Sequence, residues 1–130
     1  MKKHTRIGLF VLIITLMLFL CSCSLQNDPM SIYGKWKSTD GDLMQLNEDG
    51  TYWMSGYWSE EGRYSKDSRV LPLETGDREY QLLWFHPNDF SRPAYALYYV
   101  LNNGSLEMSM GVNKHDGSFD ADDVLIYVKQ

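Results

Sequence analysis

One stretch decides the fold of this chain: Leu46-Asn47-Glu48-Asp49-Gly50-Thr51-Tyr52. Its Asp-Gly pair supplies the positive backbone φ that tight hairpin turns need, and apolar or aromatic residues lie on both sides of the turn. Two antiparallel strands, residues 43–47 and 51–59, are therefore expected to flank this turn.

The same alternation of short apolar runs and turn residues continues along the chain. Gly, Asp, Asn and Ser recur about every 8–12 residues from position 32 onward, a spacing typical of antiparallel all-β domains. The fold class that we predict is all-β, an antiparallel up-and-down meander of eight or nine strands. Closure into a barrel or half-barrel would remove the two exposed edges of such a meander. Besides the two strands above, strands are expected at 34–38, 62–65, 69–74, 79–85, 94–101, 105–112 and 123–129, with a turn at 66–68.

An export signal is expected ahead of this domain. Lys2, Lys3 and Arg6 form a basic start, and residues 7–20 carry no charge. A basic start, a short apolar run and small residues at its end are typical of a secretory signal. As a helix this run would be about 21 Å long, short of the roughly 30 Å hydrocarbon core of a membrane. We expect a signal peptide at 1–22, a polar tether at 23–31 and one domain at 32–130.

The end of the signal resembles the lipobox of bacterial lipoproteins. Leu20, Ser22 and Cys23 match its aliphatic residue, its small residue and the cysteine that becomes the new N-terminus. If Cys21 were the lipidated residue, Leu20 would stand where the motif has a small side chain. The resemblance implies lipidation of Cys23 with fatty acyl chains such as palmitate, and a cell-membrane anchor facing outside the cytoplasm, or an outer-membrane one if the host has that membrane. An ordinary signal peptide with two cysteines is the alternative.

Charge and cysteine content exclude several classes of protein. The chain has a net charge of −5, and the 107 residues after Cys23 carry nine basic and seventeen acidic side chains. Such an acidic domain is a poor partner for nucleic acid, which favours clustered Lys and Arg. With Cys23 as the only cysteine beyond the signal, neither an internal disulfide nor a cysteine-based zinc site is expected.

Four motifs in the first half of the domain resemble the small lipocalin-like domains of bacterial lipoproteins. In chain order they are Gly34-Lys35-Trp36, Leu46 to Tyr52, Gly62-Arg63-Tyr64 and Val70-Leu71-Pro72-Leu73. The resemblance implies a lipocalin-like barrel that the Gly-x-Trp motif opens. In that family a basic residue on a late strand covers the tryptophan, and only Lys129 is available for this role. The family's helix before the last strand has no counterpart in the short polar stretch 113–122.

Aromatic residues are the main candidates for a ligand site. They are more numerous than a small filled core requires, and they are predicted to line a pocket in the barrel mouth or to form an exposed stacking platform. Core packing and cross-strand pairing is the alternative explanation. The candidates are Trp53, Trp58, Tyr80, Trp84, Tyr95 and Tyr99.

Other clusters favour structural roles over chemistry. Four methionines and two histidines have the side chains of a soft-metal site, but methionine commonly fills cores. The acidic stretch 116–123 lacks the spacing of a calcium loop and is expected to be solvated. Glu60 and Glu61 are expected in water at a hairpin. The methionines and histidines are Met44, Met54, Met108, Met110, His86 and His115.

No cofactor, metal site or enzymatic activity is expected, because no catalytic motif is found in the sequence. The leading functional hypothesis is non-catalytic binding of a small apolar or aromatic ligand. The alternative is a solid barrel that binds a protein at the cell envelope, as an inhibitor or an assembly factor does.

Overall fold

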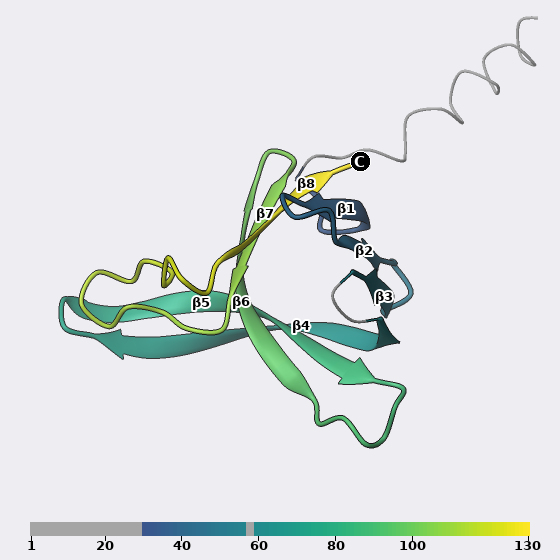
Figure 1. Cartoon of the computed structure of the whole chain (residues 1–130). Helices are drawn as coiled ribbons and strands as arrows, with labels where there is room; N and C mark the ends of the chain where they lie inside the picture. Colours follow the sequence, from purple (N-terminus) through teal and green to yellow (C-terminus); the bar gives the residue numbers. More distant parts are fainter. Residues whose placement is uncertain (1–29, 57–58) are drawn as a thin grey trace, which may run out of the picture.

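The computed structural model describes residues 30–56 and 59–130. These residues form eight antiparallel strands that pair in chain order and close into a barrel, with β8 against β1 (Figure 1). The predicted all-β meander and its closure are confirmed. The strands are β1 (Gly34–Ser38), β2 (Leu43–Leu46), β3 (Thr51–Ser55), β4 (Glu60–Leu73), β5 (Gly76–Pro87), β6 (Tyr95–Asn102), β7 (Ser105–Ser109) and β8 (Leu125–Lys129).

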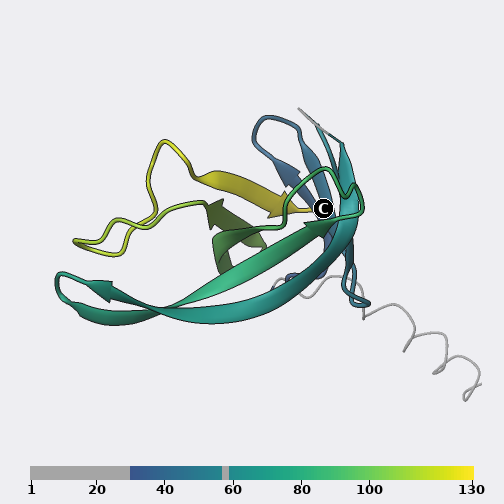
Figure 2. The same ribbon diagram turned by 90° about the horizontal axis from the view of Figure 1, so that it is seen from below.

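The largest error of the strand prediction is the expected turn at 66–68. These residues lie inside β4, which runs without a break and pairs with β5 from Gly62↔Pro87 to Leu73↔Gly76. The polar residues Lys66, Asp67 and Ser68 are exposed there, because this part of the hairpin projects beyond the barrel (Figure 2). Two expected strands, 62–65 and 69–74, are therefore one strand.

Three other strands are shorter than expected. The strand expected at 51–59 ends at Ser55, that at 105–112 ends at Ser109, and the last begins at Leu125 instead of residue 123. Position 58 lies outside the described residues, as does the whole of the expected signal and lipidation site. The described part of the chain contains no helix long and apolar enough to cross a membrane.

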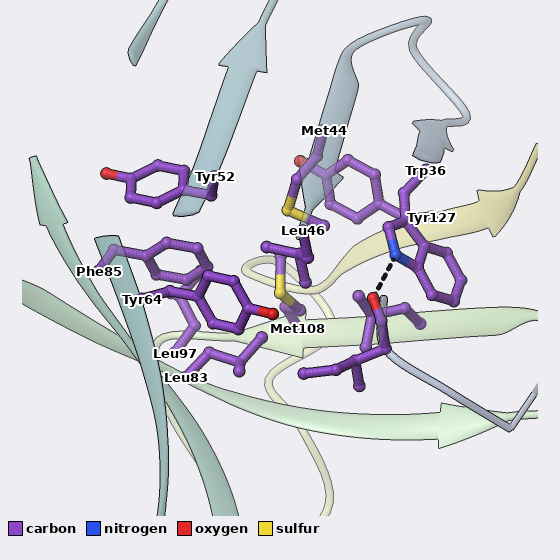
Figure 3. Packing of buried hydrophobic residues seen from close by; sticks show 12 residues of the cluster. Trp36, Met44, Leu46, Tyr52, Tyr64, Leu83, Phe85, Leu97, Met108 and Tyr127 are labelled. Carbon is purple, nitrogen blue, oxygen red and sulfur yellow. Dashed lines mark hydrogen bonds between the residues drawn. The ribbon is translucent and has the colours of Figure 1, made fainter. Parts of the chain in front are cut away.

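Side chains fill the interior of the barrel. Successive residues of a strand alternate between its two faces, so every second residue points inward. Tyr52 packs edge-on against Phe85 at 4.9 Å between ring centroids, and Phe85 stacks on Tyr95 at 5.2 Å. The buried cluster joins residues from all eight strands and the segment before β1 (Figure 3): Ile32, Trp36, Met44, Leu46, Tyr52, Tyr64, Leu83, Phe85, Leu97, Leu106, Met108 and Tyr127.

Trp36 is a fully buried member of this cluster. Its indole N–H donates a 2.8 Å hydrogen bond to the Ile32 carbonyl (Figure 3). The ammonium of Lys129 lies 5.1 Å from the centre of the Trp36 ring and donates a 2.7 Å hydrogen bond to the Ser31 carbonyl. The last strand therefore ties the chain segment before β1 to the core.

The two ends of the barrel differ in their connections. One end, the hairpin end, carries the segment before β1, the turns at 47–50 and 103–104, and the chain's last residue. The other end, the loop end, carries the connections 39–42 and 88–94.

The connection between β7 and β8 contacts one side of the projecting part of the β4–β5 hairpin. Residues 66–81 and 110–124 together form what we call the arm (Figure 1). The Glu74 amide donates to the Lys114 carbonyl at 2.9 Å, and the Tyr80 hydroxyl donates to the Gly117 carbonyl at 3.2 Å. Gly117 has a φ of 74°, and a Cβ there would lie 2.4 Å from the Tyr80 oxygen. Only glycine fits this approach without a shift.

Candidate functional site

Two adjoining clefts lie at the hairpin end and beside the arm. The mouth cleft, about 590 Å³, is lined by Ile32, Tyr33, Tyr99 and Leu101, with Lys66 and Gln81 among its polar residues. The arm cleft, about 660 Å³, is lined by residues of β5, β6 and β7 and by 116–124. Both clefts contain Gln81, Tyr99 and Val100, so they meet along β5 and β6.

The mouth cleft is where the barrel interior opens. Lys66, Gln81 and Tyr99 lie two residues beyond the buried Tyr64, Leu83 and Leu97, on the same faces of β4, β5 and β6. Lys66 pairs with Leu83 and Gln81 pairs with Tyr99 across the sheet. At the hairpin end, the apolar core is therefore followed by one layer of long side chains that carry polar groups, namely Lys66, Gln81 and Tyr99.

Charge and aromatic surface meet at the rim of the mouth cleft. The Lys66 ammonium lies 5.2 Å from the centre of the Tyr33 ring, a cation–π contact. Burial raises the pKa of Tyr99, and Tyr33 nearby adds to the shift, so the Tyr99 hydroxyl stays protonated. The cleft thus offers apolar and aromatic walls with one positive charge and neutral hydrogen-bonding groups.

The predicted ligand-binding aromatics divide into separate groups. Tyr99 lines both clefts, and Tyr80 lines the arm cleft, with its ring edge-on to Tyr98 at 5.6 Å. Trp53 and Tyr95 lie at the loop end instead. These four residues therefore belong to opposite ends of the barrel.

The remaining predicted site residues lie elsewhere. Trp84 is on the face of β5 opposite to Leu83 and Phe85, with the Arg69 guanidinium 5.9 Å from its ring. Trp58 and the lipidation residue Cys23 are outside the described residues. The five described aromatic candidates therefore do not line one common cavity.

A third cleft, about 460 Å³, lies at the loop end and contains Trp53, Glu60, Glu61, Asp89 and Arg92. We call it the loop-end cleft. Its deepest ionisable group is Glu60, whose side chain is only 5% exposed. The expectation that Glu60 stands in water is therefore wrong. The period-two alternation backward from Tyr64 and Gly62 is the sequence signal that would have placed it on the inner face.

Two phenols and a guanidinium hold the Glu60 carboxylate. The hydroxyls of Tyr52 and Tyr95 both donate to its Oε1, at 2.5 and 2.7 Å, and Arg92 Nη1 lies 3.3 Å from Oε2. Burial, followed by the hydrogen bond to Glu60, raises the pKa of both phenols well above the usual range. Both hydroxyls therefore remain donors at neutral pH.

The methionines do not converge on a metal site. Met44 and Met108 are fully buried in the core, Met54 packs at its edge, and Met110 is exposed. His115 pairs with Glu74 on the arm. Within residues 30–56 and 59–130, no group of three or more His, Cys, Asp or Glu side chains is placed to hold a metal ion.

Comparison with known proteins identifies no relative of this chain. No protein-family model matches this sequence, and neither the curated proteins nor the solved structures compared with it gave a match. Fold and clefts alone define the class: a small closed antiparallel barrel with a filled interior, two joined clefts at its hairpin end and a polar cleft at its loop end.

Proposed function

We propose that this chain is an exported, lipid-anchored protein whose lipocalin-like barrel binds a small apolar or aromatic ligand without catalysis. The observation that carries the proposal is the mouth cleft, about 590 Å³ in volume and bordered by Ile32, Tyr33, Tyr99 and Leu101. Small-molecule sites have volumes of roughly 300–1,000 Å³ and mainly apolar walls with a few polar groups. Lys66 and Gln81 supply those polar groups, so a ligand with an apolar body and one polar or anionic end fits best.

The membrane anchor rests on the sequence. Leu20, Ser22 and Cys23 match the lipobox, and acyl chains on a cysteine favour membrane insertion by about 0.8 kcal/mol per buried CH₂. Met30, at the edge of the mouth cleft, follows Cys23 by seven residues. Seven residues span at most about 25 Å. A lipid on Cys23 would therefore keep the cleft close to the membrane surface, where amphiphilic ligands concentrate.

The lipocalin-like assignment has support in the barrel itself. The meander closes in chain order, and the Lys129 ammonium lies over the Trp36 ring, the role that the resemblance requires of a late basic residue. The filled interior argues that a ligand would sit in the mouth and not deep in the barrel.

Titration of the full-length protein in detergent-free lipid nanodiscs with the fluorescent apolar probe 1-aminoanthracene tests the proposal. Tyr99→Ala is expected to weaken binding at least severalfold, since it removes the aromatic wall shared by both clefts. Phe90→Ala is the matched control, because Phe90 is fully exposed at the loop end. Equal affinity of the two variants, or no saturable binding to the unaltered protein, would refute mouth-cleft binding. Native mass spectrometry of the purified protein would identify a co-purified ligand.

The second candidate function is binding of an envelope protein, and one observation favours it. Phe90 is fully exposed on a braced loop, where the Ser91 amide and hydroxyl donate to Asp89 Oδ1 at 2.9 and 2.7 Å. An aromatic side chain held in solvent by a hydrogen-bonded loop is of a residue type that is enriched at protein interfaces. Cross-linking on intact cells separates the candidates: loss of a partner in Phe90→Ser, with probe binding unchanged, supports a protein-binding barrel.

A further inference from the structure

The outer surface of the barrel carries apolar side chains around its last strand. Ile126 and Val128 flank the buried Tyr127 on β8, so they point outward, and they are 39% and 50% exposed. Val100 on β6 and Leu43 on β2 also occupy outward positions, and each is 40% exposed. Exposed apolar residues that adjoin one another on a surface are typical of an interaction site.

Strand pairing makes these residues neighbours. Residues that pair across a sheet lie on the same face of it. β8 lies between β7 and β1 in the closed barrel (Figure 1), so outward residues of five consecutive strands form one area, which we call the seam face. The seam face consists of two neighbouring rows of paired residues: Leu43, Lys37 and Val128 across β2, β1 and β8, and Val100, Glu107 and Ile126 across β6, β7 and β8.

The seam face has one charge on each side of β8. Lys37 lies on the β1 side and Glu107 on the β7 side. Neighbouring strands are about 4.8 Å apart, so these two backbones are separated by roughly 10 Å. Within residues 30–56 and 59–130 neither side chain forms an ion pair. Each charge is therefore available to an opposite charge on a binding partner.

We propose that the seam face binds a second copy of this chain, with β8 packed over β8 about a two-fold axis that runs along the strand. Such an axis exchanges the two sides of β8, so Glu107 of each copy would face Lys37 of the other. By the same exchange, Val100 would face Leu43. Packed sheets lie about 10 Å apart, a distance that a lysine and a glutamate side chain bridge together. The seam face is thus complementary to itself, as a two-fold dimer requires.

The orientation of this dimer agrees with the proposed lipid anchor, and this step rests on that part of the proposed function. An axis along β8 leaves the hairpin ends of both copies, where residue 30 lies, on the same side of the dimer. Two copies anchored in one membrane need this arrangement, whereas an axis across the strands would put the hairpin ends on opposite sides. Two convex barrels share a small contact area, so we expect the dimer mainly on the membrane, where the anchors raise the effective concentration.

Cross-linking of the full-length protein in lipid vesicles tests the proposal. Val128→Cys places a thiol beside the two-fold axis, and a short bismaleimide is the fitting reagent because sheets about 10 Å apart are too distant for a direct disulfide. Val70→Cys is the matched control, since Val70 is a valine 62% exposed on the arm, and the unaltered protein measures any reaction of its own cysteines. Cross-linked dimer is expected from position 128 and little from position 70. Equal yields from the two positions would overturn the proposal, as would a product with a different protein in place of the dimer when the reaction is repeated on intact cells.

Charge reversal tests the assigned orientation. Glu107→Lys and Lys37→Glu, each added to Val128→Cys, are expected to lower the dimer yield about threefold or more, because each puts like charges opposite one another. The double reversal restores opposite charges and is expected to recover the yield, while Glu48→Lys, the same change on the exposed β2–β3 turn, leaves it unaltered. Equal yields in all these variants, or no recovery in the double reversal, would contradict the interface. Flotation of the vesicles reports the anchor separately: protein that does not float but still cross-links through position 128 overturns the anchor and supports the interface.

Discussion

Replacing Glu60 by alanine tests how much one buried carboxylate at the loop end contributes to the stability of the barrel. The substitution leaves two largely buried phenols, Tyr52 and Tyr95, without the acceptor that both now share. A buried polar group without a partner costs about 1–3 kcal/mol, and the exposed contact to Arg92 contributes at most about 1 kcal/mol. Glu60→Ala should therefore lower the free energy of unfolding by about 3 kcal/mol, a large share of the roughly 5–15 kcal/mol of a typical domain.

Urea unfolding, followed by tryptophan fluorescence, measures this loss. Glu61→Ala is the matched control: the neighbouring carboxylate is exposed, so its removal should change stability by less than about 0.5 kcal/mol. Glu60→Gln keeps an oxygen acceptor and should lose less than Glu60→Ala. If Glu60→Ala and Glu61→Ala unfold at the same urea concentration, the two phenols do not depend on Glu60 and the reasoning fails.

Three further predictions concern the arm, the tyrosines and the anchor. Gly117→Ala should separate residues 113–119 from the β4–β5 hairpin at a cost of about 1–3 kcal/mol, because its Cβ would lie 2.4 Å from the Tyr80 oxygen. Faster amide exchange at 113–119 would report this, and Gly41→Ala, with positive φ but no atom within 4 Å, isolates the cost of φ alone. Because burial raises the folded-state pKa of Tyr52 and Tyr95, their contribution to stability is complete below the unfolded value of about 10 and declines as pH rises beyond it. The urea midpoint should thus be insensitive to these phenols from pH 7 to 9 and fall at pH 11, and a midpoint that rises over that interval would contradict the sign. Cys23→Ser should move the protein from the membrane fraction to the soluble fraction, and mass spectrometry of the unaltered protein should find acyl chains on Cys23; an unmodified cysteine there would remove the anchor.

The fold followed from local signals wherever those signals were strong. The Asp49-Gly50 turn separates β2 from β3, and the turn at Asn103-Gly104 separates β6 from β7, each with positive φ at its glycine. The error at Lys66-Asp67-Ser68 has a physical origin. In the projecting part of β4, residues 65–70 are exposed on both faces of the strand, so this segment carries the same polar residues that mark a turn elsewhere.

The candidate site was harder to predict than the fold. Strand periodicity assigns a face to Tyr95 and Tyr99, which are both inward on β6, but not the end of the barrel at which each lies. The number of strands before β6 determines that end, because strand direction alternates in a meander, and counting β4 as two strands reversed it. Glu60 was missed for a related reason: sequence reasoning treated an acidic pair as solvated, whereas the barrel rim buries one member and exposes the other.

Pairing of β8 with β1 has a consequence for incomplete chains. Trp36 faces Lys129 across this seam, so nearly the whole described chain must be present before the cylinder can close. A product that stops before Leu125 keeps seven strands but has open, hydrogen-bonding edges on β1 and β7, which are templates for aggregation. Loss of the last strand, β8, is therefore expected to promote aggregation through these two edges.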